Sequence, residues 1–177
     1  GVGQLMTSMF QNMEKLAASP SDTALRVTTL DSIGRVAQAF NQTAADLKNV
    51  SAGIATEATA SVETINRSLS ALANINNSLL RAQPGTSAYA QLLDSRDAAL
   101  QTLSENMDVT ISFGARDSAE ISFAGQTLVS GNSAAGLSVA ANDDGTLALS
   151  LSDGTALSAP ANGTLGGLFS AAPTVTA

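Results

Sequence analysis

The sequence predicts an α+β protein: an elongated antiparallel helical bundle that contains one very long helix, followed by a small antiparallel β-subdomain. Between Thr23 and Ala82 no proline interrupts the chain, and apolar residues recur at alternating spacings of three and four, the period of a helix with one buried face. From Asp108 onward the period falls to two, as in strands. At about 1.5 Å per residue the long helix would be roughly 90 Å long, so the helical part is expected to be a rod.

A helical rod domain is expected over residues 1–108. It should contain three helices, at about residues 3–18, 23–82 and 87–107. The first ends where Pro20 steers the preceding residue away from helical geometry and where Ser and Asp can cap the next helix. The second ends before the turn sequence Gln83–Thr86, which holds a proline and a glycine. Short joins between the helices predict antiparallel neighbours.

The apolar seam of the long helix is weak. Many of its positions are Ala or Ser, and Gly34 and Gly53 lie within the helix, where each glycine costs up to about 1 kcal/mol relative to alanine. A seven-residue repeat of this kind needs a partner helix, and we expect a bundle rather than a free two-stranded coiled coil. The family resemblance described below implies a further helix after residue 168 that packs back along the rod; without it, seam residues such as Ile33, Phe40 and Leu47 are expected to lack full cover, which predicts either pairing with a second molecule or a frayed first hairpin.

The β-subdomain is expected over residues 109–160. Apolar residues alternate with polar ones in short runs, and turn sequences separate the runs, including the hairpin dipeptides Asp144–Gly145 and Asp153–Gly154. The final segment, 161–177, is interpreted as a return towards the rod, with a glycine-rich turn and then, from Ser170, either a short tail or a piece of a further helix.

Composition argues against several classes of function. The chain has neither Cys nor His, which removes thiolate and imidazole catalysis and the usual zinc ligand sets. Eight basic against fifteen acidic residues, a net charge of −7, leave no basic surface for nucleic acid. No apolar run has the length of a membrane span, and no charged region followed by an apolar run marks a cleaved signal peptide. We predict a protein that is not an enzyme, binds no cofactor or metal, and contacts neither nucleic acid nor membrane.

Two groups of charged residues invite a chemical role, and both have a simpler interpretation. Asn142–Gly145 offers oxygen ligands beside a glycine, but no Glu follows it, whereas a calcium loop of the EF-hand type ends on one. A hairpin turn explains this segment better. Asp94, Arg96 and Asp97 lie within one helical turn, and we expect a salt-bridge cluster in which Arg96 orders the neighbouring backbone through charge-assisted hydrogen bonds.

The run Leu92-Leu93-Asp94-Ser95-Arg96-Asp97, followed by helix and then by a strand after Asp108, resembles the flagellar hook-associated protein 1 family, the first of the two hook-filament junction proteins. Val62–Asn66, Asn74–Asn76 and Gly163–Leu168 agree in order and spacing. The resemblance is to a central fragment of that family and covers nearly the whole chain. It implies a structural role for the motif residues Leu92, Leu93, Asp94, Arg96, Asp97, Gly163, Leu165, Gly166, Gly167 and Leu168.

The resemblance implies a structural component of the bacterial flagellum at the hook-filament junction, assembled by the packing of helical rods. Its implied partners are the flagellar hook protein, the second hook-filament junction protein and further copies of itself in a ring. The implied location is extracellular, after export without a cleaved signal peptide. Two other classes stay open at this point: another helical assembly protein, such as a flagellin-like or phage-tail component, and an extracellular calcium-dependent adhesive module.

Overall fold

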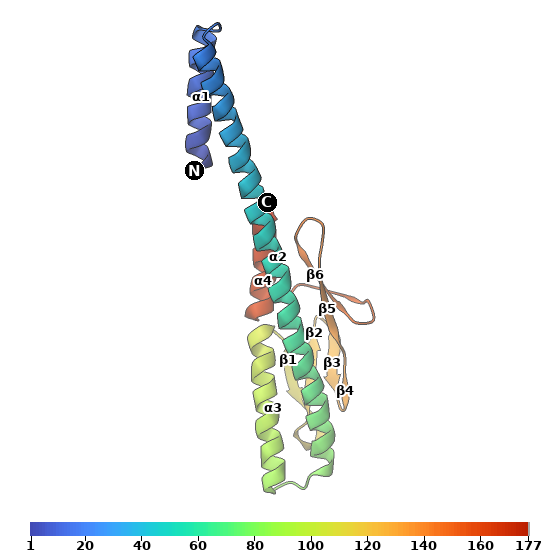
Figure 1. Ribbon diagram of the computed structural model, residues 1–177. Coiled ribbons are helices and arrows are strands. Elements are labelled where there is room, and N and C mark those ends of the chain that lie inside the picture. The colour runs from blue at the N-terminus through green and yellow to red at the C-terminus, as the bar shows by residue number, and fades with distance from the viewer. Residues whose placement is uncertain (177) are drawn as a thin grey trace. The chain divides into compact units, whose positions relative to one another are not determined.

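The predicted fold class is confirmed by the structure, a computed structural model that describes residues 1–176. Within these residues, seven short strands accompany four α-helices, which are α1 (Val2–Ala18), α2 (Thr23–Arg81), α3 (Ser87–Asn106) and α4 (Gly163–Thr176) (Figure 1). The chain divides into two compact units, Gly1–Val50 and Ser51–Ala177. The helix α2 is continuous over 59 residues and contributes to both units.

In the first unit, α1 and residues 23–50 of α2 form an antiparallel hairpin (Figure 1). The Asp22 carboxylate accepts a hydrogen bond from the backbone N–H of Leu25 at 3.1 Å, and this bond caps α2. Across the hairpin, the Thr29 hydroxyl hydrogen-bonds the backbone oxygen of Asn12 at 3.2 Å. Within residues 1–50, Thr29 and Val36 are the buried side chains and both belong to α2. The two helices therefore share a thin core.

In the second unit, residues 51–81 of α2 share one hydrophobic core with α3, α4 and both sheets (Figure 1). Ile65 and Leu72 on α2 and Leu103 on α3 are fully buried in this core. The two helices run antiparallel, because the hydroxyl of Ser61 donates a hydrogen bond to the side-chain oxygen of Asn106, the last residue of α3, at 2.8 Å.

The strands form two antiparallel sheets within the predicted β-subdomain. The first sheet contains β1 (Thr110–Phe113), β2 (Ala119–Phe123), β3 (Gln126–Ser130) and β4 (Ser133–Ala134), and the second contains β5 (Leu137–Ala141), β6 (Leu147–Leu151) and β7 (Ala156–Leu157). The chain changes sheet between two neighbouring residues: Ala135 donates its N–H to Leu128 at 2.8 Å, and the oxygen of Gly136 accepts from Ser152 at 2.9 Å. A Cβ on Gly136 would overlap the Ser152 hydroxyl, so a larger residue there would force this side chain into another rotamer.

Of the two alternatives for the segment from Ser170, a short tail and a piece of a helix, the structure shows the helix as far as Thr176. The helix α4 continues to that residue, and Leu165 and Ala172 are buried on it. Burial of one helix face therefore extends the helix past its glycine-rich start. The last residue of this segment, Ala177, lies outside the described residues.

Candidate functional site

Arg96 is the centre of the motif on α3. Its guanidinium donates to the Asp97 carboxylate at 2.9 and 3.0 Å, and to the backbone oxygen of Asp117 at 2.8 Å. It also lies over the ring of Phe113, 4.5 Å from the centroid, at a distance where a cation and an aromatic ring attract each other. Asp94 is exposed and forms no ion pair within residues 1–176. Arg96 thus joins α3 to the first sheet, and the expected cluster of three charged residues is reduced to two.

The turn between β1 and β2 is held by two side chains that sequence reasoning missed. Arg116 donates to three backbone oxygens at the end of α2, where helix carbonyls lack partners of their own. The Tyr89 hydroxyl hydrogen-bonds the Asp117 carboxylate at 2.8 Å and the backbone oxygen of Arg116 at 3.1 Å. The pKa of Tyr89 is raised most by the hydrogen bond to Asp117 and less by the loss of solvent around the hydroxyl. Arg116 and Asp117 have φ of 57° and 59°, which side-chain-bearing residues rarely adopt, so these contacts are needed to hold the turn.

The glycine-rich segment Gly163–Gly167 packs against the end of α3. At two of its three glycines, a side chain would clash with neighbouring backbone atoms. A Cβ on Gly163, whose φ is +77°, would lie 2.5 Å from the carbonyl carbon of Asn106. A Cβ on Gly166 would lie 2.8 Å from the carbonyl carbon of Ala161. Nothing lies within 4 Å of a Cβ placed on Gly167, so close packing does not explain that glycine. The first two let α4 start against the backbone that precedes it.

The leucines of the two motifs lie in different parts of the second unit, and only those of α4 belong to its core. Leu92 and Leu93 are half-buried in the first half of α3, whereas Leu165 is fully buried and Leu168 half-buried in α4. The first motif contacts the turn between β1 and β2 through Arg96, and the second contacts the end of α3. The structure therefore gives the two motifs separate structural places rather than one common site.

Two asparagines on α2 connect the helix to the two sheets. Asn76 is 1% exposed, and its amide accepts from the N–H of Ala119 at 2.8 Å and donates to the oxygen of the same residue at 2.9 Å. Asn66 makes the same pair of bonds with Leu137, at 2.8 and 2.9 Å. Ala119 starts β2 and Leu137 starts β5. Each amide therefore fixes the first residue of one strand, one in each sheet.

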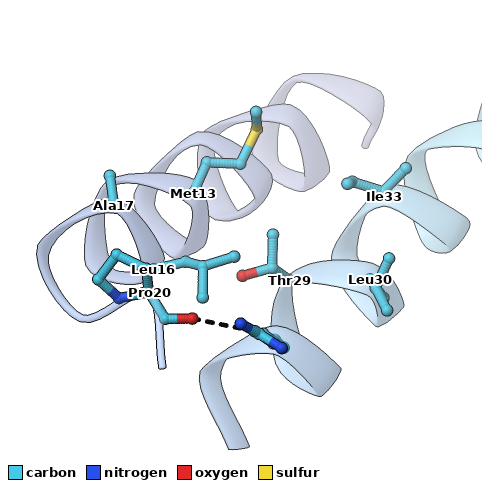
Figure 2. Close-up of a pocket in the computed structure, with 8 residues that line it drawn as sticks. Met13, Leu16, Ala17, Pro20, Thr29, Leu30 and Ile33 are labelled. Atoms are coloured by element: carbon cyan, nitrogen blue, oxygen red, sulfur yellow. Dashed lines mark hydrogen bonds between the residues drawn. The ribbon is translucent and has the colours of Figure 1, made fainter. Parts of the chain in front are cut away.

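In the first unit, an apolar groove of about 550 Å³ lies between α1 and α2. Figure 2 shows Met13 and Leu16 on one side of it and Leu30 and Ile33 on the other. The hydrogen bond from Arg26 to the backbone oxygen at position 20, 3.0 Å long, closes one end. The groove has no cluster of polar side chains at its centre, so its chemistry suits an apolar partner surface.

The carboxylates of the second sheet's hairpin turns are used within the turns. Asp144 accepts bonds from the N–H of Thr146 at 2.9 Å and from its hydroxyl at 2.5 Å, and these bonds lower the pKa of Asp144. Residues 1–176 hold no group of three or more carboxylates arranged for a metal ion, and no helix among them is long and apolar enough to cross a membrane. The geometry around Asp144 is that of a turn.

Comparison with known proteins gives one consistent result. A protein-family model described as "Flagellar hook-associated protein FlgK helical domain" matches residues 1–177. Flagellar hook-associated protein 1 of Bacillus subtilis (strain 168) is 25% identical over 113 residues, which cover 64% of this chain and 22% of that protein. The solved flagellar hook junction protein FlgK from Burkholderia pseudomallei shares the fold at a TM-score of 0.79 and 25% identity, over 96% of this chain and 32% of that one. This chain thus spans about a third or less of the length of these two relatives.

Proposed function

The chain belongs to the flagellar hook-associated protein FlgK helical-domain family, and from this we propose that it forms part of a structural component of the bacterial flagellum at the hook-filament junction. The observation that carries the proposal is the family match over residues 1–177. The fold shared with a flagellar hook junction protein, at a TM-score of 0.79, supports it. In this proposal the role of the chain is structural; without Cys and His it has neither a thiolate nucleophile nor an imidazole base.

The contacts of the second unit support a role as a rigid scaffold. A protein that joins two polymers has to keep its shape under load, and here side chains tie helices to sheets at several independent points. Asn66 and Asn76 each hold one sheet on α2, while Arg96 and Arg116 hold one turn on α3 and α2. In this proposal the two family motifs position the parts of the scaffold and bind no ligand.

The proposed partners follow from the same family. They are the flagellar hook protein, the second hook-filament junction protein and further copies of this protein. The proposed location is the extracellular flagellum, reached by export without a cleaved signal peptide. The absence of Cys is compatible with folding outside the cell without disulfides.

A chimera tests this proposal. The segment of Bacillus subtilis flagellar hook-associated protein 1 that matches this chain would be replaced by this chain's own residues, in a strain that lacks the natural protein. An epitope tag allows the exported chimera to be located by immunogold electron microscopy, with the tagged natural protein as the control. We expect gold at the boundary between hook and filament and restored filaments. An exported chimera that is found only along filaments or in the medium would contradict the proposal.

A further inference from the structure

The dipeptide Asn162-Gly163 stands at the junction where the chain leaves the second sheet and α4 begins. No other asparagine of the sequence is followed by a glycine. Glycine has no Cβ, so it does not obstruct the approach of the preceding side chain to its backbone nitrogen. The side-chain carbonyl carbon of an asparagine and that nitrogen can close a five-membered ring. The sequence therefore singles out this dipeptide for a spontaneous reaction of the chain with itself.

Both reacting groups of the dipeptide are free. Asn162 and Gly163 are exposed. The side-chain amide of Asn162 bonds none of the residues 1–176, although its backbone N–H donates to the Asp108 carboxylate at 3.0 Å. Gly163 is the first residue of α4, so its N–H has no partner within the helix, and no other described residue accepts from it. The nucleophilic nitrogen and the carbonyl carbon are thus both accessible and unengaged.

Two related dipeptides in the turns of the second sheet show the opposite arrangement. In Asp144–Gly145 and Asp153–Gly154, the N–H of each glycine donates to the backbone oxygen three residues earlier, at 2.9 Å in both turns. Each carboxylate accepts a hydrogen bond from the N–H of the threonine two residues later, also at 2.9 Å. The fold therefore engages both groups in these turns and leaves both free at Asn162–Gly163.

We propose that Asn162 is a site of spontaneous deamidation in the folded protein. The backbone nitrogen of Gly163 attacks the side-chain carbonyl carbon of Asn162, and the new C–N bond closes a succinimide ring. The bond between that carbon and the amide nitrogen breaks, and ammonia leaves with the proton that Gly163 loses. Water then opens the ring at one of its two carbonyl carbons, which gives aspartate or isoaspartate. This inference does not depend on the flagellar role.

The two products change the start of α4 in different ways. Aspartate at position 162 adds a negative charge at a helix N-terminus, where such a charge is favourable, but beside the carboxylate of Asp108 that accepts from the same residue. Isoaspartate adds a methylene to the backbone directly before Gly163, where even a Cβ would lie 2.5 Å from the carbonyl carbon of Asn106. The lengthened backbone displaces one of these contacts, so isoaspartate should loosen α4 from the end of α3.

Storage of the purified chain at mildly alkaline pH tests the site, with peptide mass spectrometry and isoaspartyl methyltransferase labelling to follow the conversion. We expect Asn162 to lose its amide roughly tenfold faster than any other asparagine, which corresponds to an activation free energy lower by about 1.4 kcal/mol. Asp153→Asn is the matched control, because it creates the same dipeptide in a turn where the glycine N–H is already bonded. Its conversion should be roughly tenfold slower than that of Asn162. Equal rates at the two sites would overturn the structural argument.

The same measurement in guanidinium chloride separates the effect of the fold from that of the sequence. Unfolding should change the rate at Asn162 by less than roughly tenfold, whereas it should accelerate the Asp153→Asn site. A folded chain that keeps the Asn162 amide while the unfolded chain loses it would overturn the proposal, because the fold would then protect this dipeptide.

Hydrogen exchange of the stored chain tests the consequence for α4. Asn162→Gln keeps an amide but lengthens the side chain by one methylene, so the five-membered ring cannot form. After equal storage, the amides of α4 should exchange faster in the parent than in this variant, and those between Ile65 and Leu79 should be the same in both. Equal exchange of α4 in a parent that has formed isoaspartate would contradict the proposed loosening.

Discussion

The two halves of α2 carry the same apolar period and meet opposite environments. Leu72, in the second half, is 0% exposed, whereas Leu30, in the first half, is 68% exposed. Both lie on one continuous helix. The period therefore tells which face of a helix is apolar, but it does not tell what covers that face.

The covering differs because the second half receives partners from four other parts of the chain. Sheets, α3 and α4 all contribute to its core, and the polar side chains Asn66 and Asn76 on the same half are fully used by strand backbones. The first half has α1 as its partner within its unit, joined through Thr29 and a hydrogen bond between Asn12 and Ser32. Stability should accordingly be concentrated in the second half.

The same substitution in each half gives the largest expected contrast. Leu72→Ala removes a fully buried side chain and should lower the free energy of unfolding by about 2 to 5 kcal/mol, the range for Leu-to-Ala changes in cores. Leu30→Ala, at an exposed site, should change it by less than about 0.5 kcal/mol. Urea unfolding of the dilute chain, followed by circular dichroism, measures both. Equal losses would remove the distinction between the two halves.

The asparagine contacts should determine how firmly each sheet is held on the second half of α2. Asn76→Ala leaves the N–H and oxygen of Ala119 without their partner, and each such buried group costs about 1 to 3 kcal/mol. Hydrogen exchange should then rise in the first sheet, whereas Asn66→Ala should raise it in the second. Asn74→Ala, at an exposed position of the same helix, is the control. If both sheets loosen together in either variant, the two contacts do not act separately.

The ion pairs of Arg96, in the second unit, and Arg35, in the first, should also contribute unequally to stability, with the larger contribution in the second unit. Arg96 is 13% exposed and also bonds a backbone oxygen, so Arg96→Ala should cost about 1 to 3 kcal/mol, the range for hydrogen bonds to charged groups. Arg35 forms an exposed pair with Asp31 at 2.9 Å, and Arg35→Ala should cost at most about 1 kcal/mol. Thermal unfolding compares the two variants. An Arg96 variant that melts like the parent would mean that this side chain only fills surface space.

The smallest expected effect is a change in how the melting temperature falls at low pH. Hydrogen bonds from Thr146 hold the pKa of Asp144 below its usual value, and bonds from Thr155 do the same for Asp153. A lowered folded-state pKa gives stability that is present above the unfolded pKa of about 4 and is lost as the pH falls through the folded value. Replacing both residues by Asn should therefore flatten the fall of Tm below about pH 4. Asp143→Asn is the control, and a slope unchanged by the double variant would contradict the interpretation.

The sequence predicted the elements better than the contacts between them. The helical period and the change of period at Asp108 are local signals, and both correspond to real elements. Asn76 also left a signal, because it lies on the apolar seam with Leu72 and Leu79, where a polar residue needs a partner. Its partner Ala119 is 43 residues away in the chain, so no local pattern could identify it.

Two other features depended on contacts that composition does not reveal. Arg116 caps the end of α2 across at least 34 residues, and nothing in its neighbourhood marks it as a capping residue. The helix α4 starts with glycines that normally predict a turn, and it forms because Leu165 is buried against the core. The expected salt-bridge cluster around Arg96 was right for Asp97, while Asp94 lies exposed.

Amide hydrogen exchange along α2 tests the central claim most directly. In dilute solution, at about 10 µM, local opening should follow burial, so amides between Ile65 and Leu79 should exchange far more slowly than those between Leu30 and Leu47. Uniformly slow exchange from Leu30 to Leu79 in a dilute monomer would contradict the account, because it would mean that the first half of α2 is covered as well as the second half.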